Sequence, residues 1–109
     1  MTLFDERERA FESLFVHEEA MRFRALARRN QLFARWAADQ LRLGPTKSHA
    51  YIRAFVNDAV QPERAAPLIS RVRDDFRAEG LEISDERIGA ALARTAAEAA
   101  RQVRAEVIA

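Results

Sequence analysis

The sequence predicts an all-α protein: a four-helix bundle-like domain with a long N-terminal helical arm. Ala, Leu, Arg and Glu dominate the chain, and all four are good helix formers. Only 3 Gly and 3 Pro occur in 109 residues, so few positions interrupt the helices. Apolar residues recur at helical spacing, without the alternation of a half-buried strand. Since 49% of the residues are hydrophobic, the chain can bury one modest core.

The first helical segment is the longest. Its periodicity begins near Asp5, and no Gly or Pro interrupts it before Gly44-Pro45. We expect this dipeptide to end the helix, with Gly44 in the left-handed conformation and Pro45 unable to continue it. At about 100° per residue, one narrow stripe holds five apolar residues: Phe4, Phe11, Phe15, Leu26 and Phe33.

Three charged residues, Glu18, Glu19 and Arg22, interrupt this stripe, and a buried core would not accept them in succession. Beyond them the apolar arc widens, as a core-facing helix requires, to include Phe23, Leu32, Phe33, Trp36, Ala37 and Leu41. The sequence therefore predicts two units: an N-terminal partner-binding arm over residues 1–19 and a helical bundle domain over residues 20–109.

Two shorter helices follow. We expect one over about residues 47–59, capped by Thr46 or Ser48 and broken by Pro62, with an apolar face of Ile52, Phe55, Val56 and Ala59. Pro67 is suited to the first position of the next helix, and Gly80 to its end. The apolar residues of that third helix are Leu68, Ile69, Val72 and Phe76.

Ser84 is the expected cap of a fourth helix, because Asp85 and Glu86 in its first turn favour the positive end of the helix dipole. Its apolar stripe consists of Ile88, Leu92, Ala96, Ala99 and Val103. The alanines on this stripe would allow close packing against a neighbouring helix.

Charge is unevenly distributed although the net charge is only +1. Residues 1–19 hold six acids against two arginines, a net charge of −4, whereas residues 20–43 hold six arginines against one acid, a net charge of +5. Such asymmetry can mark a segment with its own function.

The pattern leaves two interpretations of the arm open. Its phenylalanines pack along the bundle as an N-terminal hook, or Phe11 and Phe15 anchor the arm in a groove of another protein, where its acids meet basic rims.

The composition excludes several classes of site. Without Cys, neither a disulfide nor a thiolate metal site is possible. His17-Glu18-Glu19 begins like a zinc-protease helix, but Met21 occupies the position of the second histidine. No glycine-rich phosphate loop is present, so we expect no enzyme, no catalytic residues and no metal. We also expect no signal peptide and no membrane insertion, hence a cytoplasmic protein.

Arginines suggest two further features. Arg24, Arg28, Arg35 and Arg42 share one helical face, which we interpret as solvated, because a near-neutral chain without a recognition motif is not expected to bind nucleic acid. Arg29 and Asn30 instead lie within the apolar arc, where a guanidinium needs a partner. That partner is an acid such as Glu98 or Asp75, or an anionic ligand such as a nucleotide phosphate.

The chain resembles the zeta subunit of alphaproteobacterial F-type ATP synthases in the run FDERERAFESLFVHEEAMRFRALARRNQLFARWAA. The matching positions are Phe4-Asp5, Arg7-Glu8, Ala10-Phe11-Glu12, Phe15, His17, Glu19, Phe23, Ala27-Arg28-Arg29-Asn30, Leu32 and Trp36-Ala37-Ala38. Looser matches follow at Tyr51, Val72-Arg73, Asp75-Phe76 and Arg101-Gln102-Val103. Ala34 stands where the family commonly has Gly, and the segment from Gln61 to Pro67 also differs.

This resemblance implies an inhibitor of ATP hydrolysis. Zeta subunits insert their N-terminal helical segment between the alpha and beta subunits of the catalytic head, with gamma as a further candidate contact. The implied partner-binding residues are Phe4, Asp5, Arg7, Glu8, Phe11, Glu12, Phe15, His17 and Glu19. The protein would be monomeric when free and peripheral to the inner membrane through the synthase.

The resemblance also implies that ATP or ADP is a candidate ligand of the bundle, while no cofactor is required. Arg29, Asn30 and Trp36 are the expected nucleotide-binding residues. A small nucleotide-sensing helical regulator is therefore the alternative function.

Overall fold

The computed structural model describes residues 2–58 and 64–108, apart from the side chains of Phe11, Phe15, Asp58 and Ile108. These residues form four α-helices and no strand, which confirms the all-α fold: α1 (Leu3–Gln40), α2 (Pro45–Asp58), α3 (Ala65–Ala78) and α4 (Asp85–Ile108). The predicted helix end at Ala59 and the break at Pro62 lie outside the described residues.

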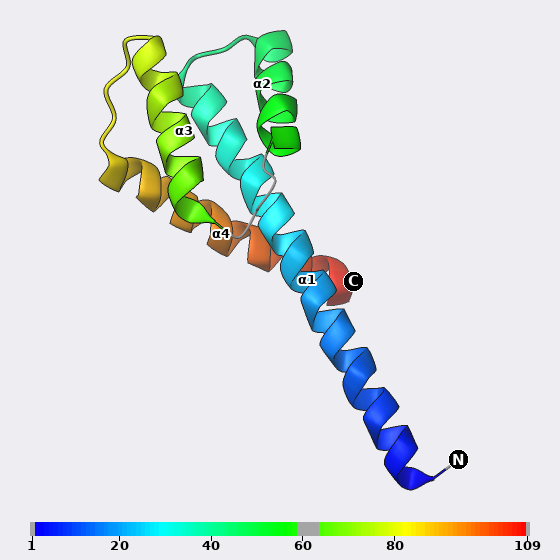
Figure 1. Ribbon diagram of the computed structural model, residues 1–109. Helices are drawn as coiled ribbons and strands as arrows, with labels where there is room; N and C mark the ends of the chain where they lie inside the picture. Colours follow the sequence, from blue (N-terminus) through cyan, green and yellow to red (C-terminus); the bar gives the residue numbers. More distant parts are fainter. Residues whose placement is uncertain (1, 59–63, 109) are drawn as a thin grey trace.

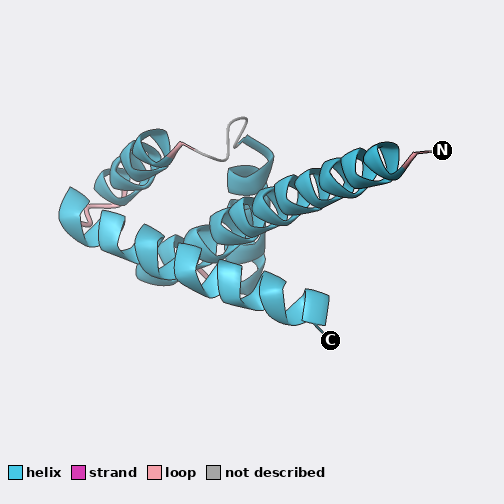
Figure 2. Cartoon of the chain, turned by 90° about the horizontal axis from the view of Figure 1, so that it is seen from below, coloured by secondary structure: helices cyan, strands magenta, loops and turns pink. Residues whose placement is uncertain are grey.

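The C-terminal half of α1 packs against α2 and α4, and α3 packs against α4 (Figure 1). The N-terminal half of α1 leaves this bundle and projects away from it, as Figure 2 shows from a perpendicular direction. The molecule therefore measures 65 × 26 × 21 Å. Its radius of gyration is 17.8 Å, well above the roughly 13 Å of a compact domain of this length.

Helix α1 begins two residues earlier than predicted because Thr2 caps it. The Thr2 hydroxyl accepts a hydrogen bond from the Asp5 amide at 3.2 Å, and an Asp5 carboxylate oxygen accepts one from the Thr2 amide at 3.5 Å. This reciprocal capping box satisfies two amides that no helical carbonyl could reach. The projecting end of α1 therefore has a defined start although nothing packs on it in the described structure.

The end of α1 differs from the prediction. The helix ends at Gln40, and Arg42, at φ 56°, takes the left-handed position that was expected of Gly44. The Leu43 amide donates to the Ala38 carbonyl at 3.2 Å and the Arg42 amide to the Asp39 carbonyl at 3.1 Å. These two bonds form a Schellman motif around a residue that is not glycine.

Gly44-Pro45 instead begins the next helix. Pro45 is the first residue of α2, and the Ser48 amide donates to the Gly44 carbonyl at 2.8 Å. Proline suits this position because its missing N–H would have no helical acceptor there. The prediction that Thr46 or Ser48 caps this helix was therefore wrong.

Helices α3 and α4 are closer to the prediction. Pro67 is the third residue of α3 rather than the first, still within the turn where its missing N–H is tolerated. Gly80, at φ 73°, closes α3 with a Schellman motif, since the Leu81 amide donates to the Phe76 carbonyl at 2.8 Å. The Ser84 hydroxyl accepts from the Arg87 amide at 3.2 Å, which confirms Ser84 as the cap of α4.

The two Schellman motifs predict opposite changes in stability when glycine is removed from one and introduced into the other. No heavy atom lies within 4 Å of a Cβ built at Gly80, so Gly80→Ala should destabilise the protein only through backbone strain, by about 1 kcal/mol. Arg42→Gly should stabilise it by about 0.5 kcal/mol, because the strain relieved outweighs the added freedom of the unfolded chain. Urea unfolding of both variants measures this, and shifts of the same sign would contradict it.

The core of the bundle is a cluster of aromatic rings from three helices. Phe33 of α1 is stacked on Trp36 at a ring separation of 5.8 Å and meets Phe55 of α2 edge-on at 6.0 Å. Trp36 in turn contacts Phe76 of α3 at 5.7 Å. Around these rings pack several fully or almost fully buried residues: Ala34, Ala37, Val72, Ile88, Ala91 and Leu92.

Phe23 was predicted to belong to this core, and that prediction was wrong, since its side chain is 63% exposed. Helical geometry places it about 80° from Phe33 around the axis, at the margin of the core face. It also lies more than a turn before Arg29, the first buried residue of α1. A helical pattern predicts the direction in which a side chain points. It does not predict whether another helix extends far enough along α1 to cover that side chain.

Tyr51 connects α2 to α3. Its hydroxyl donates a hydrogen bond of 2.7 Å to an Asp75 carboxylate oxygen. Burial, and then this bond to Asp75, raise the pKa of Tyr51 above that of an ordinary tyrosine. In the same region the Arg71 guanidinium lies over the Phe55 ring, 4.6 Å from its centroid. A polar bridge and a cation–π contact thus hold α2 and α3 together beside the aromatic cluster.

Candidate partner-binding site

The projecting half of α1 exposes apolar side chains to solvent. Every described side chain from Thr2 to Ala20 is exposed, and Phe4 reaches 73%. Leu3 and Leu14 are also exposed large hydrophobics. Together with positions 11 and 15, they lie within an arc of about 120° around the helix. The first interpretation of the arm, in which its phenylalanines pack along the bundle, is therefore wrong for Phe4.

Acids flank this apolar arc. Asp5, Glu8, Glu12 and Glu19 follow one another at helical spacing, and all four are exposed. Asp5 also belongs to the capping box. The remaining polar residues predicted to bind a partner, Arg7 and His17, are exposed as well but lie off the acidic strip. The helix thus presents an apolar arc with a negative border, although the contacts of these residues with a partner stay a prediction.

The C-terminal turns of α4 brace α1 where the projecting segment meets the bundle. Glu106 accepts from Arg24 at 2.5 Å and pairs with Arg28 at 2.6 Å, while the Gln102 amide oxygen accepts from Arg28 at 2.9 Å. Arg24 is still exposed, as the prediction of a solvated arginine face requires, whereas Arg28 is half-buried and departs from it. The sequence carried no signal for this contact, because it depends on how α4 crosses α1.

The three residues predicted to bind nucleotide occupy two different environments. Arg29 and Asn30 are buried, and the Asn30 side-chain oxygen accepts from both Nε and Nη2 of Arg29 at 3.1 and 3.0 Å. Neither of the acids expected as partners, Glu98 or Asp75, is the acceptor in these two bonds. Trp36 lies half-buried in the aromatic cluster. Nucleotide binding by these residues stays a prediction.

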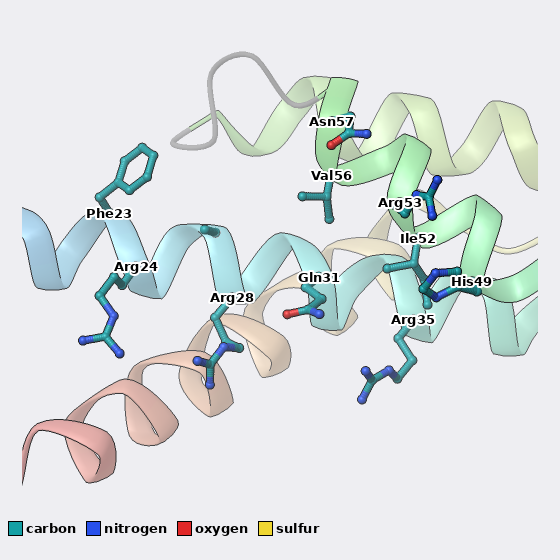
Figure 3. Close-up of a pocket in the computed structure, with 11 residues that line it drawn as sticks. Phe23, Arg24, Arg28, Gln31, Arg35, His49, Ile52, Arg53, Val56 and Asn57 are labelled. Atoms are coloured by element: carbon teal, nitrogen blue, oxygen red, sulfur yellow. The ribbon is translucent and has the colours of Figure 1, made fainter.

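A groove of about 470 Å³ runs between α1 and α2 (Figure 3). On α1 it is lined by Phe23, Arg24, Ala27, Arg28, Gln31 and Arg35. On α2 it is lined by His49, Ile52, Arg53, Val56 and Asn57. The sequence pointed to the arginine face of α1, but it did not indicate that α2 turns this face into one wall of a groove.

The described residues contain no helix that is both long and apolar enough to span a membrane. Nor do they contain a cluster of three or more His, Asp or Glu side chains suited to a metal ion. What the described surface offers is an exposed amphipathic helix and a cationic groove, and both are features of binding rather than of covalent chemistry.

Residues 1–102 match the family described as ATPase inhibitor subunit zeta. The chain belongs to this family. The match covers the projecting part of α1 together with almost the whole bundle, so the resemblance seen in the first 38 residues extends to α4. No curated protein and no solved structure matches the chain.

Membership of the zeta family gives the protein a role in regulating an ATPase, as an inhibitor subunit that interacts with the ATP synthase. It points to a regulatory rather than an enzymatic function.

Proposed function

We propose that this zeta-family chain inhibits ATP hydrolysis by inserting its arm, residues 1–19, at a catalytic interface between the alpha and beta subunits of the F-type ATP synthase, with gamma as a further contact. The observation that carries this proposal is the arm itself, a capped helix that presents exposed apolar side chains outside the bundle. Large apolar side chains exposed in this way are typical of a surface that another protein covers.

The physical basis of binding is helix-in-groove recognition. Because the arm is already helical, docking does not require the backbone to be ordered at that moment, and more of the contact energy remains for affinity. Phe4, Phe11 and Phe15 would provide the buried anchors, since phenylalanine offers much apolar area for few rotatable bonds. Glu8, Glu12 and Glu19 would meet basic groups at the rim of the cleft and determine orientation.

Inhibition follows from the shape of the molecule. Residues 3–20 span roughly 27 Å along the helix axis, and the four-helix bundle begins where this projecting segment ends. A helix that enters a closing catalytic interface to this depth would block the conformational cycle on which hydrolysis depends. On this proposal the protein works in the cytoplasm, peripheral to the inner membrane through the synthase.

Two complementary fragments test this function. A peptide of residues 1–19 should suppress ATP hydrolysis by the isolated catalytic head, although less potently than the full chain, because a free peptide is less helical. A chain that begins at Ala20 should not inhibit. Circular dichroism and thermal unfolding show whether the shortened chain keeps its bundle. Full inhibition by a folded chain without residues 1–19 would disprove the proposal.

A further inference from the structure

A second apolar strip runs along α1 on a side that the arm's phenylalanine stripe does not use. Val16, Ala20, Phe23 and Ala27 are all exposed, and their spacing places them on one helical face. Phe23 and Ala27 belong to the wall of the α1–α2 groove. Figure 3 shows Ile52 and Val56 projecting from α2 toward α1, so the strip continues into an apolar floor.

The borders of this groove are cationic. Arg24, Arg28, Arg35 and Arg53 line it, and none of its described lining residues is an acid. Arg24 and Arg28 are paired with Glu106. Arg35 and Arg53 are exposed, and each makes no ion pair with the described residues. An apolar floor between unpaired guanidinium groups is complementary to a helix that is apolar on one face and acidic at its edges.

We propose that the α1–α2 groove is a second docking site, which takes an acidic amphipathic helix of the same ATP synthase whose catalytic interface receives the arm. This inference rests on the proposed function, because it takes the same enzyme as the partner. The apolar face of the incoming helix would cover Phe23, Ile52 and Val56, while its carboxylates would pair with Arg35 and Arg53.

The acidic arm of a second copy of this chain fits the groove less well. Helical geometry places the apolar strip through Val16 and Phe23 about 130° around α1 from the stripe through Phe4, Phe11 and Phe15. Two copies related by a twofold axis contact one another through one common face of each helix. A symmetric antiparallel pair could therefore not engage the phenylalanine stripe and the groove at the same time.

Because the phenylalanine stripe of the arm and the α1–α2 groove lie on different faces of α1, they can contact one large partner at two separate points. Once the arm is inserted, the groove stays attached to the same helix and experiences a high local concentration of its own target. A weak contact there would slow the release of the arm without adding to the block itself. The groove would therefore add to how tightly the inhibitor is held, whereas the arm would supply the main anchors and, alone, the block itself.

Charge reversal at the unpaired arginines tests this division of roles. The full chain carrying Arg35→Glu and Arg53→Glu should bind the isolated catalytic head about tenfold more weakly, while inhibition at saturating concentration stays as in the wild type. The matched control carries Arg87→Glu and Arg94→Glu, two exposed positions of α4 outside the groove. Because both double variants change the net charge equally, general electrostatic steering cannot explain a difference between them.

Affinity from fluorescence titration, together with ATP hydrolysis, separates the possible results. If the Arg35→Glu and Arg53→Glu chain binds like its matched control, the second docking site is disproved while the proposed function stands. If the wild type neither binds the head nor inhibits it, the proposed function itself fails.

A photo-crosslinking residue at position 23 of the full chain identifies the occupant. Crosslinking to an acidic helical segment of the catalytic head supports the proposal. Crosslinking only to a second copy of this chain would overturn it. A second combination of results would also overturn it: free ATP prevents crosslinking at position 23, and the Arg35→Glu and Arg53→Glu chain binds the catalytic head as tightly as the wild type. The groove would then be a site for small anions.

Discussion

Replacing Phe4, Phe11 and Phe15 together with alanine should lower the inhibitory potency of the full chain by about two orders of magnitude. Truncation of an aromatic anchor that a partner buries typically costs about 1–3 kcal/mol, and even a total of about 3 kcal/mol weakens binding roughly 150-fold. Stability should barely change, because Phe4 is 73% exposed and belongs to a segment whose described side chains are all exposed. Titration of ATP hydrolysis with wild type and variant measures the difference.

A matched variant separates loss of the anchors from loss of apolar surface in general. Val107→Ala removes an exposed apolar side chain from α4, at the other end of the chain, and should inhibit like the wild type. Alanine is the best helix former, so the triple variant should keep its helical circular dichroism signal. A triple variant as potent as the wild type would rule out the phenylalanine stripe as the inhibitory surface.

Phe33→Ala should have the largest effect on stability, a loss of about 3–5 kcal/mol of unfolding free energy. Phe33 is fully buried and its ring contacts both Trp36 and Phe55, so its removal leaves a cavity where α1 meets α2. Domains of this size are stable by only about 5–15 kcal/mol. We therefore expect a much lower urea midpoint and a partly unfolded bundle at physiological temperature.

Phe23→Ala is the natural comparison, since it removes the same side chain from the same helix three turns earlier. Phe23 is 63% exposed, and surface substitutions usually change stability by less than about 0.5 kcal/mol. The pair thus tests the correction that the structure made to the predicted core. Equal losses of stability in the two variants would show that Phe23 is buried after all.

Most of the secondary structure could be predicted because its signals are local. Ser84 before two acids identified the start of α4, and Gly80 identified the end of α3. The errors occurred where two local signals competed. Gly44-Pro45 resembles a helix end, but Pro45 begins α2 and Arg42 takes the left-handed position that glycine usually occupies. A backbone conformation of this kind is decided by how the neighbouring helices pack, and sequence preference is only one contribution to it.

The sequence by itself determined that the protein is helical, that its first helix carries a phenylalanine stripe with acidic borders, and that charged residues interrupt this stripe before the bundle. Each of these properties depends on residues a few positions apart, which helical geometry relates directly. Only the tertiary structure decided that Glu106 braces Arg24 and Arg28, that Arg29 bonds to Asn30 within the core, and that α2 forms a cationic groove with α1. The Glu106 contacts and the groove join residues that are distant in the chain, whereas the Arg29–Asn30 bond depends on which side chains the packed helices bury. Burial and ion pairing are determined only when the helices come together.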